Sequence, residues 1–350
     1  MKLTLFDYKL PQALIANEPA SPRDHSRVLI YDKNNDSVIH EKFYNIHKFL
    51  RKGDLLIFNN SKVMAARLYG GKTTGGKIEI LLLKDFEKGK WEAMIKGKNL
   101  KPEQILHFKV GLTAQLISKS SEKTWLLQFN FKGKKLNEII EKYGQVPIPP
   151  YIQSQLTQSK LKTKYNTVYA KHSGSSAAPT AGLHFTPGLM KKIESVGVQS
   201  EYITLHVGMG TFESVMTEDI QDHSMHSEHV IVDLSTIKAI QSALKRQKAG
   251  EDVRIISVGT TTTRTLEALG SELFKAKKKI EKDVNIFIYP GYKFKIVDAM
   301  FTNFHLPKST LLMLISALIG REKVMVLYKL AIKLKYRFYS FGDSMFLITK

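Results

Sequence analysis

The pattern of apolar and polar positions changes twice along the chain. Strand-like apolar runs at residues 27–31 and 54–58 mark the first part. From about residue 61 to 131, helical periodicity is weak and short β-rich runs alternate with glycine or lysine turns, at residues 77–83, 91–95, 114–117 and 124–129. Several short strands with closely spaced turns are typical of a small barrel. This block therefore predicts a compact β-barrel.

A proline-rich segment follows the block. Three of the chain's eleven prolines fall within residues 147–150, which predicts a stiff linker at 143–151. Beyond it, we expect strands at 202–207, 230–234, 253–258, 284–289 and 296–301. Helices are expected at 189–196, 237–248, 262–274, 309–320 and 322–333, with Ser235 and Ser309 as N-caps. This alternation indicates a mostly parallel α/β domain into which the β-rich block is inserted.

Charge narrows the class of partner. The 350 residues carry 53 Lys plus Arg against 32 Asp plus Glu, a net charge of +21. Such an excess favours a polyanionic partner, with RNA or DNA ahead of a membrane surface. The alternative is a lysine-rich composition set by the genome, and the two explanations are compatible.

The absence of cysteine excludes several chemistries. A chain with no cysteine has no disulfide, no catalytic thiolate, no cysteine-bound zinc and no cysteine-held iron–sulfur cluster. The N-terminus lacks the apolar run of a signal peptide. The most apolar window, residues 311–319, is far shorter than the roughly 20 residues that span a bilayer. We therefore expect a cytoplasmic protein without membrane contact.

Four polar stretches at the ends of predicted strands carry the candidate chemistry. They lie at residues 177–186, 204–212, 258–264 and 302–307 and combine glycine, threonine and histidine. Glycine lets the backbone approach a ligand, threonine offers a hydroxyl, and histidine titrates near neutral pH. The third also begins a helix, whose N-terminus suits an anion. Each could alone be a turn or a cap, but four together predict one assembled pocket and an enzyme.

Two further clusters allow more than one interpretation. His223, His226 and His229 are spaced by three residues around Glu228, but a strand at 230–234 would place them on different faces, so we expect ligand contact or structural hydrogen bonding rather than a metal site. The charged turn at 23–27 is typical of a surface or an internal ion pair.

Lysines of the inserted block suit nucleic acid. Lys72, Lys77, Lys96, Lys98 and Lys101 lie in the same block as Trp91 and Phe108. A basic barrel with aromatic residues can track phosphates and stack bases. A solvated surface explains the same lysines equally well.

Long specific strings identify a family. They include Arg-Asp-His-Ser-Arg at 23–27, Ala-Ala-Pro-Thr-Ala-Gly-Leu-His-Phe at 177–185, Val-Gly-Thr-Thr at 258–261 and Thr-Asn-Phe-His-Leu-Pro at 302–307. At these motifs, and nearly from end to end, the chain resembles the S-adenosylmethionine:tRNA ribosyltransferase-isomerases of queuosine biosynthesis. A non-catalytic RNA-binding protein would account for the charge and the barrel but not for the four polar loops.

The resemblance implies a fold and a reaction. The fold class is α/β, with a barrel-like α/β main domain at residues 1–60 and 151–350 and an inserted small β-barrel domain at 61–150, which contacts tRNA. The ribosyl part of S-adenosylmethionine moves onto the aminomethyl group of a 7-deazaguanine at the tRNA wobble position. Rearrangement gives epoxyqueuosine and releases adenine and methionine. S-adenosylmethionine is a co-substrate, and we expect a monomer with neither a metal nor a permanently bound cofactor.

The resemblance also implies site residues. The acid and base groups of the matched stretches are His184, His206, His226, Glu228 and His305, and base and acid are not assigned among them. The expected substrate-binding residues are Arg27, Thr180, Gly182, Gly208, Gly210, Thr211, Thr260, Thr261, Arg264 and Asn303. Lys77, Lys98 and Lys101 are expected to contact tRNA.

Three positions depart from the family pattern. The family usually has Asn-Asp where this chain has Asn59-Asn60, and we expect a structural role there. The basic loop at 96–99 is shorter and less arginine-rich than usual. The tail has Tyr339-Ser340-Phe341 where the family has an aromatic residue, Ser and Tyr.

Overall fold

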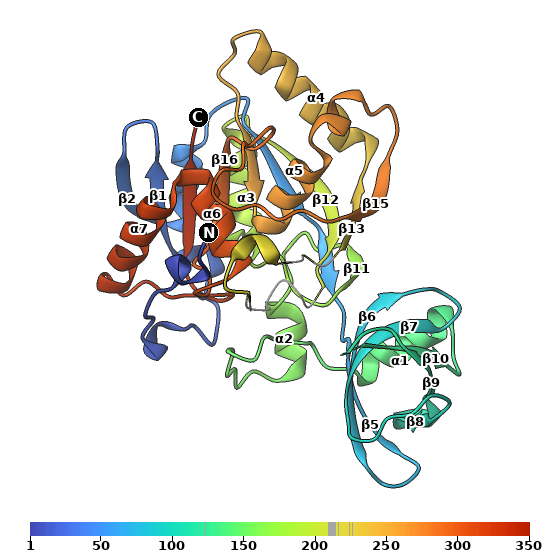
Figure 1. Cartoon of the computed structure of the whole chain (residues 1–350). Coiled ribbons are helices and arrows are strands. Elements are labelled where there is room, and N and C mark those ends of the chain that lie inside the picture. Colours follow the sequence, from blue (N-terminus) through green and yellow to red (C-terminus); the bar gives the residue numbers. More distant parts are fainter. Residues whose placement is uncertain (123, 209–214, 216, 224, 226) are drawn as a thin grey trace.

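The computed structural model describes residues 1–122, 124–208, 215, 217–223, 225 and 227–350. Within these ranges, nine strands form one large sheet (Figure 1). Their spatial order is β15 (Ile280–Val284), β13 (Glu228–Val232), β12 (Gln199–His206), β3 (Leu55–Asn59), β14 (Ile255–Val258), β16 (Ala299–Asn303), β17 (Ser344–Ile348), β1 (Arg27–Asp32) and β2 (Ser37–Lys42).

The large sheet is mixed rather than mostly parallel. Its central neighbours β12, β3, β14 and β16 run parallel, and β1 is parallel to β17. The remaining pairs, which include both edges, are antiparallel. Because the central strands run the same way, their carboxyl ends meet at one edge, where ligands bind in open α/β sheets.

Both faces of the large sheet are covered. Successive side chains of a strand point to opposite faces, so Leu55 and Ile57 of β3 pack with α4 (Leu234–Lys248) and α5 (Thr260–Lys275). Leu56 and Phe58 pack on the other face with α3 (Pro187–Ser195). Helices α6 (Thr310–Ile319) and α7 (Arg321–Lys333) share a core with β1 and β17.

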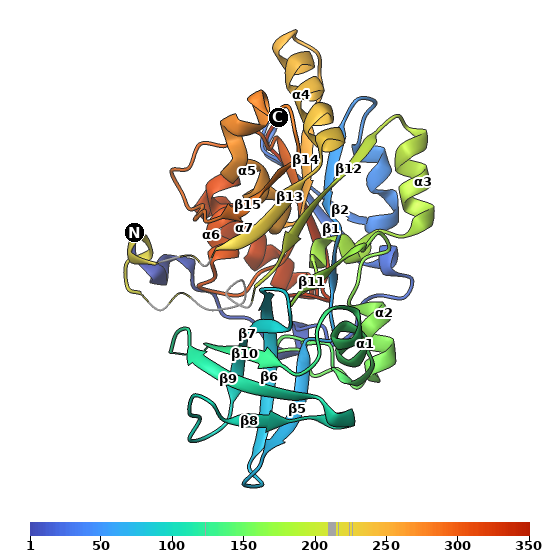
Figure 2. The same cartoon turned by 90° about the vertical axis from the view of Figure 1, so that its right-hand side faces the viewer.

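Six described strands close into a barrel at one end of the molecule (Figure 2). They are β5 (Arg67–Lys72), β6 (Lys77–Asp85), β7 (Lys90–Lys96), β8 (Ile105–His107), β9 (Thr113–Lys119) and β10 (Thr124–Phe129). Helix α1 (Gly133–Tyr143) packs on the barrel core, and α2 (Gln158–Lys164) follows. The chain leaves and re-enters the large sheet beside a short ladder of β4 (Ser61–Val63) and β11 (His172–Ser175).

The fold class is confirmed as α/β with a closed small barrel. Ser309 caps α6 as predicted, since its hydroxyl accepts from Leu312 N at 3.2 Å. The prediction of Ser235 as an N-cap was wrong, because the N-cap of α4 is Asp233, two residues earlier. The strand predicted at 284–289 instead ends at Val284. No described helix is both long and apolar enough to cross a membrane.

Candidate active site

A small pocket, here the inner pocket, lies at the carboxyl edge of the central strands. It gathers residues from three of the four polar stretches together with Val207 of the remaining one. Its polar lining comes from Tyr151, Thr180, Thr260, Thr261, Thr302, Asn303, His305, Tyr339 and Ser340. The single pocket expected from the sequence therefore draws on all four stretches.

The start of α5 forms one side of the inner pocket. Gly259 precedes the helix with a φ of 91°, a left-handed conformation that favours glycine, and no side chain caps the helix. Thr262 and Thr263 turn their hydroxyls back to the carbonyls of Val258 and Gly259. Thr260 and Thr261 line the pocket. The first turn of α5 thus presents N–H groups and two hydroxyls to a polar or anionic group.

His305 forms the opposite side and is held from several directions. Its Nε2 lies 2.7 Å from Thr302 Oγ1, its backbone N donates to the Tyr328 hydroxyl at 2.8 Å, and its carbonyl accepts from Tyr8. Burial, aided by the positive charge of Arg264, lowers the pKa of His305 to about 3. The ring is therefore neutral at neutral pH, the form that accepts a proton.

A third wall of the inner pocket comes from segments that the sequence did not single out as a site. Tyr339 has a left-handed φ of 69°, which is uncommon outside glycine. Its carbonyl accepts from Asn303 Nδ2 at 2.9 Å and from Gly342 N at 3.0 Å. The hydroxyls of Tyr151 and Ser340 lie 2.7 Å apart. In the sequence, the signal for this wall was the departure from the family pattern at residues 339–341, and it did not indicate a function for these residues.

A second, more open cavity lies between the barrel and the large sheet, and we call it the outer cleft. Barrel residues Lys84, Asp85, Trp91, Glu92 and Glu122 form one side. The other side comes from β11, β12, β13 and β15, with Gly174, His206, Gly208, Glu228, His229 and Asp283. Lys84 Nζ and Asp283 Oδ2 are 3.0 Å apart and join the two sides.

His206 and Glu228 are the candidate acid/base groups in the outer cleft. Burial, with contributions from His229 and His172, lowers the pKa of His206 to about 4. A Cβ atom on Gly174 would lie 2.9 Å from the His206 ring, so glycine lets this backbone lie against it. Glu228 Oε2 accepts from Arg264 Nη2 at 2.5 Å, and both side chains are buried.

The two cavities share the end of β12 as a wall. His206 and Gly208 line the outer cleft, whereas Val207 between them lines the inner pocket. The alternation of side chains along an extended chain explains this arrangement. The two cavities are therefore neighbours along residues 206–208.

Several predicted site residues line neither cavity. His184 is buried, its Nδ1 lies 2.8 Å from Ser26 Oγ, and burial lowers its pKa to about 4. Gly182 is needed for packing, because an added Cβ would lie 1.9 Å from the Tyr169 hydroxyl. Arg264 acts through Glu228 rather than from the lining. Gly210, Thr211 and His226 fall outside the described residues.

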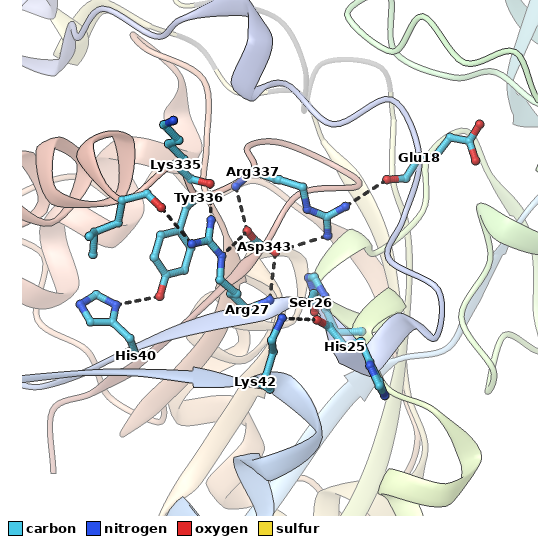
Figure 3. Close-up of polar contacts among 12 residues, drawn as sticks. Glu18, His25, Ser26, Arg27, His40, Lys42, Lys335, Tyr336, Arg337 and Asp343 are labelled. Carbon is cyan, nitrogen blue, oxygen red and sulfur yellow. Dashed lines mark hydrogen bonds and ion pairs between the residues drawn. The ribbon is translucent and has the colours of Figure 1, made fainter.

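Arg27 belongs to an internal network (Figure 3). Its guanidinium stacks 4.0 Å from the centre of the Tyr336 ring and lies 3.3 Å from Asp343. Asp343, which is 2% exposed, also accepts from Arg337. The other members of the charged turn tie different segments together, since Arg23 donates to Asn166 O and Asp24 accepts from Thr186. The turn is thus an internal ion-pair site, one of the two interpretations above.

The remaining predictions concern Asn60, the lysines and a metal. Asn60 Oδ1 accepts from Thr204 Oγ1 at 2.7 Å and lines neither cavity, in line with a structural role.

Lys77 and Lys98 border a hollow on the barrel with Lys72 and Lys96, and Lys101 is exposed outside it. Among the described residues, no group of three or more His, Cys, Asp or Glu could hold a metal ion.

Comparisons with known proteins agree with one another. The sequence model of the family described as queuosine biosynthesis protein matches residues 3–347. The S-adenosylmethionine:tRNA ribosyltransferase-isomerase of Thermoanaerobacter sp. (strain X514) is 46% identical over 99% of this chain and 100% of its own length. The crystal structure of S-adenosylmethionine tRNA ribosyltransferase from Thermotoga maritima is 34% identical, with a TM-score of 0.54, over 98% of this chain and 100% of that one. The chain therefore belongs to the queuosine biosynthesis protein family, the transferases that include the S-adenosylmethionine:tRNA ribosyltransferase-isomerases.

Proposed function

We propose that the protein transfers and isomerises the ribosyl moiety of S-adenosylmethionine onto 7-aminomethyl-7-deazaguanine at the tRNA wobble position. The products are epoxyqueuosine in tRNA, adenine and methionine. The observation that carries the proposal is the shared wall of the two cavities, because Val207 faces one and His206 the other. A donor and an acceptor that exchange a sugar must lie next to each other, so the reaction requires the two neighbouring cavities to join at this wall.

S-adenosylmethionine is assigned to the inner pocket, whose cavity of about 50 Å³ has to widen when the ligand binds. The uncapped N-terminus of α5 suits its carboxylate, and the hydroxyls of Thr180, Thr260 and Thr261 suit the ribose. The substrate-binding role of Asn303 follows from its place in the same lining.

The wobble base is assigned to the outer cleft. A nucleotide needs an open entrance, and this cleft lies beside the barrel. The carboxylates of Asp85, Glu92, Glu122, Glu228 and Asp283 border it. They suit the positively charged aminomethyl group of the base and disfavour phosphate.

The neutral histidines support proton removal. The sulfonium makes the C5′ protons of the ribose acidic, and a general base forms the ylide. Adenine then leaves with a proton, and the amine nitrogen attacks the sugar as methionine is expelled. His305 and His206 are unprotonated at neutral pH, because their pKa values lie near 3 and 4. Each is a candidate base, although a pKa this low makes the ring a weak base before the substrates bind. The histidine that takes the C5′ proton becomes the cationic acid that can protonate the departing adenine. The scheme requires no metal.

A division of labour follows from the same assignment. We infer that residues 1–60 and 151–350 form the catalytic domain, and that the barrel within 61–150 binds tRNA through Lys77, Lys98 and Lys101. All three lysines are exposed, and the barrel contributes no residue to the lining of the inner pocket. We further expect the protein to act as a monomer.

Isotope tracing tests the reaction. A methyltransferase would place the methyl carbon in tRNA and release S-adenosylhomocysteine. Ribose label from S-adenosylmethionine is expected in tRNA that carries the aminomethyl base, with methyl label recovered as methionine and one adenine released for each modified tRNA. Methyl label in the tRNA, or S-adenosylhomocysteine as a product, would refute the assignment.

A further inference from the structure

The β6–β7 hairpin connects the outer cleft to the far end of the barrel. Asp85 of β6 pairs with Trp91 of β7 at the cleft, and both residues line it. At the other end Glu79 pairs with Lys96, next to the hollow formed by Lys72, Lys77, Lys96 and Lys98. We call this hollow the lysine hollow. The turn between β5 and β6 points away from the large sheet in both views (Figures 1 and 2).

The two ends of the hairpin differ in net charge. At the cleft end, Asp85, Glu87 and Glu92 are balanced by Lys84, Lys88 and Lys90. At the far end Glu79 is neutralised by Arg67, 3.3 Å away. Within the described residues, no carboxylate pairs with Lys77, Lys96 or Lys98, and all three are exposed. Lys72 donates to the carbonyl of Lys98 and so holds the loop in place. The far end carries a net positive charge and therefore attracts phosphate more strongly than the balanced cleft end does.

The strand itself sets the distance between the two ends. Residues 77–85 form one continuous strand, β6. A strand rises about 3.3 Å for each residue, so its ends are about 25 Å apart. This span is several times the separation of neighbouring phosphates. A phosphate at the lysine hollow therefore belongs to a nucleotide well removed from the one in the outer cleft.

We propose that the lysine hollow binds backbone phosphates of the paired anticodon stem while the wobble base occupies the outer cleft. The inference rests on the proposed function, since it takes the wobble base as the occupant of the cleft. The barrel then acts as a spacer whose length matches the distance from the stem to the wobble base. Recognition through the backbone is independent of sequence and depends on the shape of the RNA.

A charge-removal experiment tests the contact. Lys77, Lys96 and Lys98 are replaced together by Gln, and the matched control replaces Lys238, Lys245 and Lys248, which are exposed on α4 at the opposite end of the molecule (Figure 1). Binding is titrated at several salt concentrations with an anticodon stem-loop and with a single-stranded loop oligonucleotide. We expect the hollow variant to lose at least about tenfold affinity for the stem-loop, with a salt slope reduced by about 0.7 to 0.9 for each lost contact. The loop oligonucleotide and the control variant are expected to show no change.

A loss that is equal for both RNAs, or absent for both, would overturn the proposal. Failure of the native enzyme to modify tRNA with S-adenosylmethionine would instead refute the proposed function and remove the basis of the inference. Normal modification together with unchanged stem-loop binding by the hollow variant would refute the lysine hollow alone.

The spacing can be measured directly because the chain has no cysteine. Lys98→Cys and Asp85→Cys each introduce a single thiol, to which an iron chelate that cleaves nearby RNA is attached. The probe at position 98 is expected to cut in the stem, and the probe at position 85 in the loop near the wobble nucleotide. Cleavage by the position-98 probe at the wobble nucleotide would contradict the distance derived from β6.

Discussion

Acid is expected to destabilise this protein through its buried neutral histidines. Burial is the main cause that lowers the pKa of His184 and His206 to about 4 and that of His305 to about 3. In the unfolded chain a histidine has a pKa of about 6.5. Between these values only the unfolded state binds the proton, so the free energy of unfolding falls as the pH falls. Above pH 6.5 the histidines are neutral in both states and do not lower the free energy of unfolding. This loss of stability grows as the pH falls toward 4.

The size of this destabilisation follows from the difference between the pH and the pKa of a histidine in the unfolded chain. At pH 5, about 1.5 pH units below the unfolded value, each such histidine costs about 2 kcal/mol, at about 1.36 kcal/mol for each unit. This is a large share of the 5 to 15 kcal/mol that typically stabilises a native domain. Because carboxylates also titrate near pH 5, the histidine contribution is best isolated by a variant.

His184→Gln isolates one histidine, and this residue lines neither proposed substrate cavity. Urea unfolding at pH 7 and pH 5 measures the free energy of unfolding. We expect the variant to lose about 2 kcal/mol less than the native protein over this interval. His107→Gln, at an exposed histidine of the barrel, is the control and is expected to match the native protein. An identical pH dependence for His184→Gln and the native protein would refute the reasoning.

Three further predictions address function. Binding to tRNA is expected to weaken with salt by about 0.7 to 0.9 in log–log slope for each neutralised phosphate, and a slope near zero would assign the +21 charge to composition alone. Lys98→Ala with Lys101→Ala is expected to weaken tRNA binding and spare S-adenosylmethionine, which calorimetry with each ligand measures; equal loss of both contradicts the division of labour. His206→Ala and His305→Ala are each expected to lower turnover at least about a hundredfold if the residue transfers a proton. Circular dichroism checks that these variants fold, and a near-normal rate in a folded variant removes that histidine from the mechanism.

Local patterns were sufficient for most elements of the fold. The fully buried β3 and the Ser309 cap of α6 could be predicted because burial and capping depend on residues close in sequence. Helix α1 was missed, although its core contacts use Leu136 and Ile140 in helical spacing. The strand at 280–284 was misplaced because its interior residues are exposed and polar, which hides the usual alternation.

The sequence by itself determined the family, the α/β class with an inserted barrel, and the four polar stretches, but it predicted a mostly parallel sheet where the structure has a mixed one. These depend on residue strings and on periodicity, which are properties of neighbours along the chain. Only the tertiary structure decided which polar residues share a cavity. It placed His305 in the inner pocket, His206 in the outer cleft and His184 in neither. The physical reason is that β12 and β16 end at one edge of the sheet, whereas the backbone around His184 turns its ring toward Ser26. Contacts between residues more than a hundred positions apart leave no local pattern.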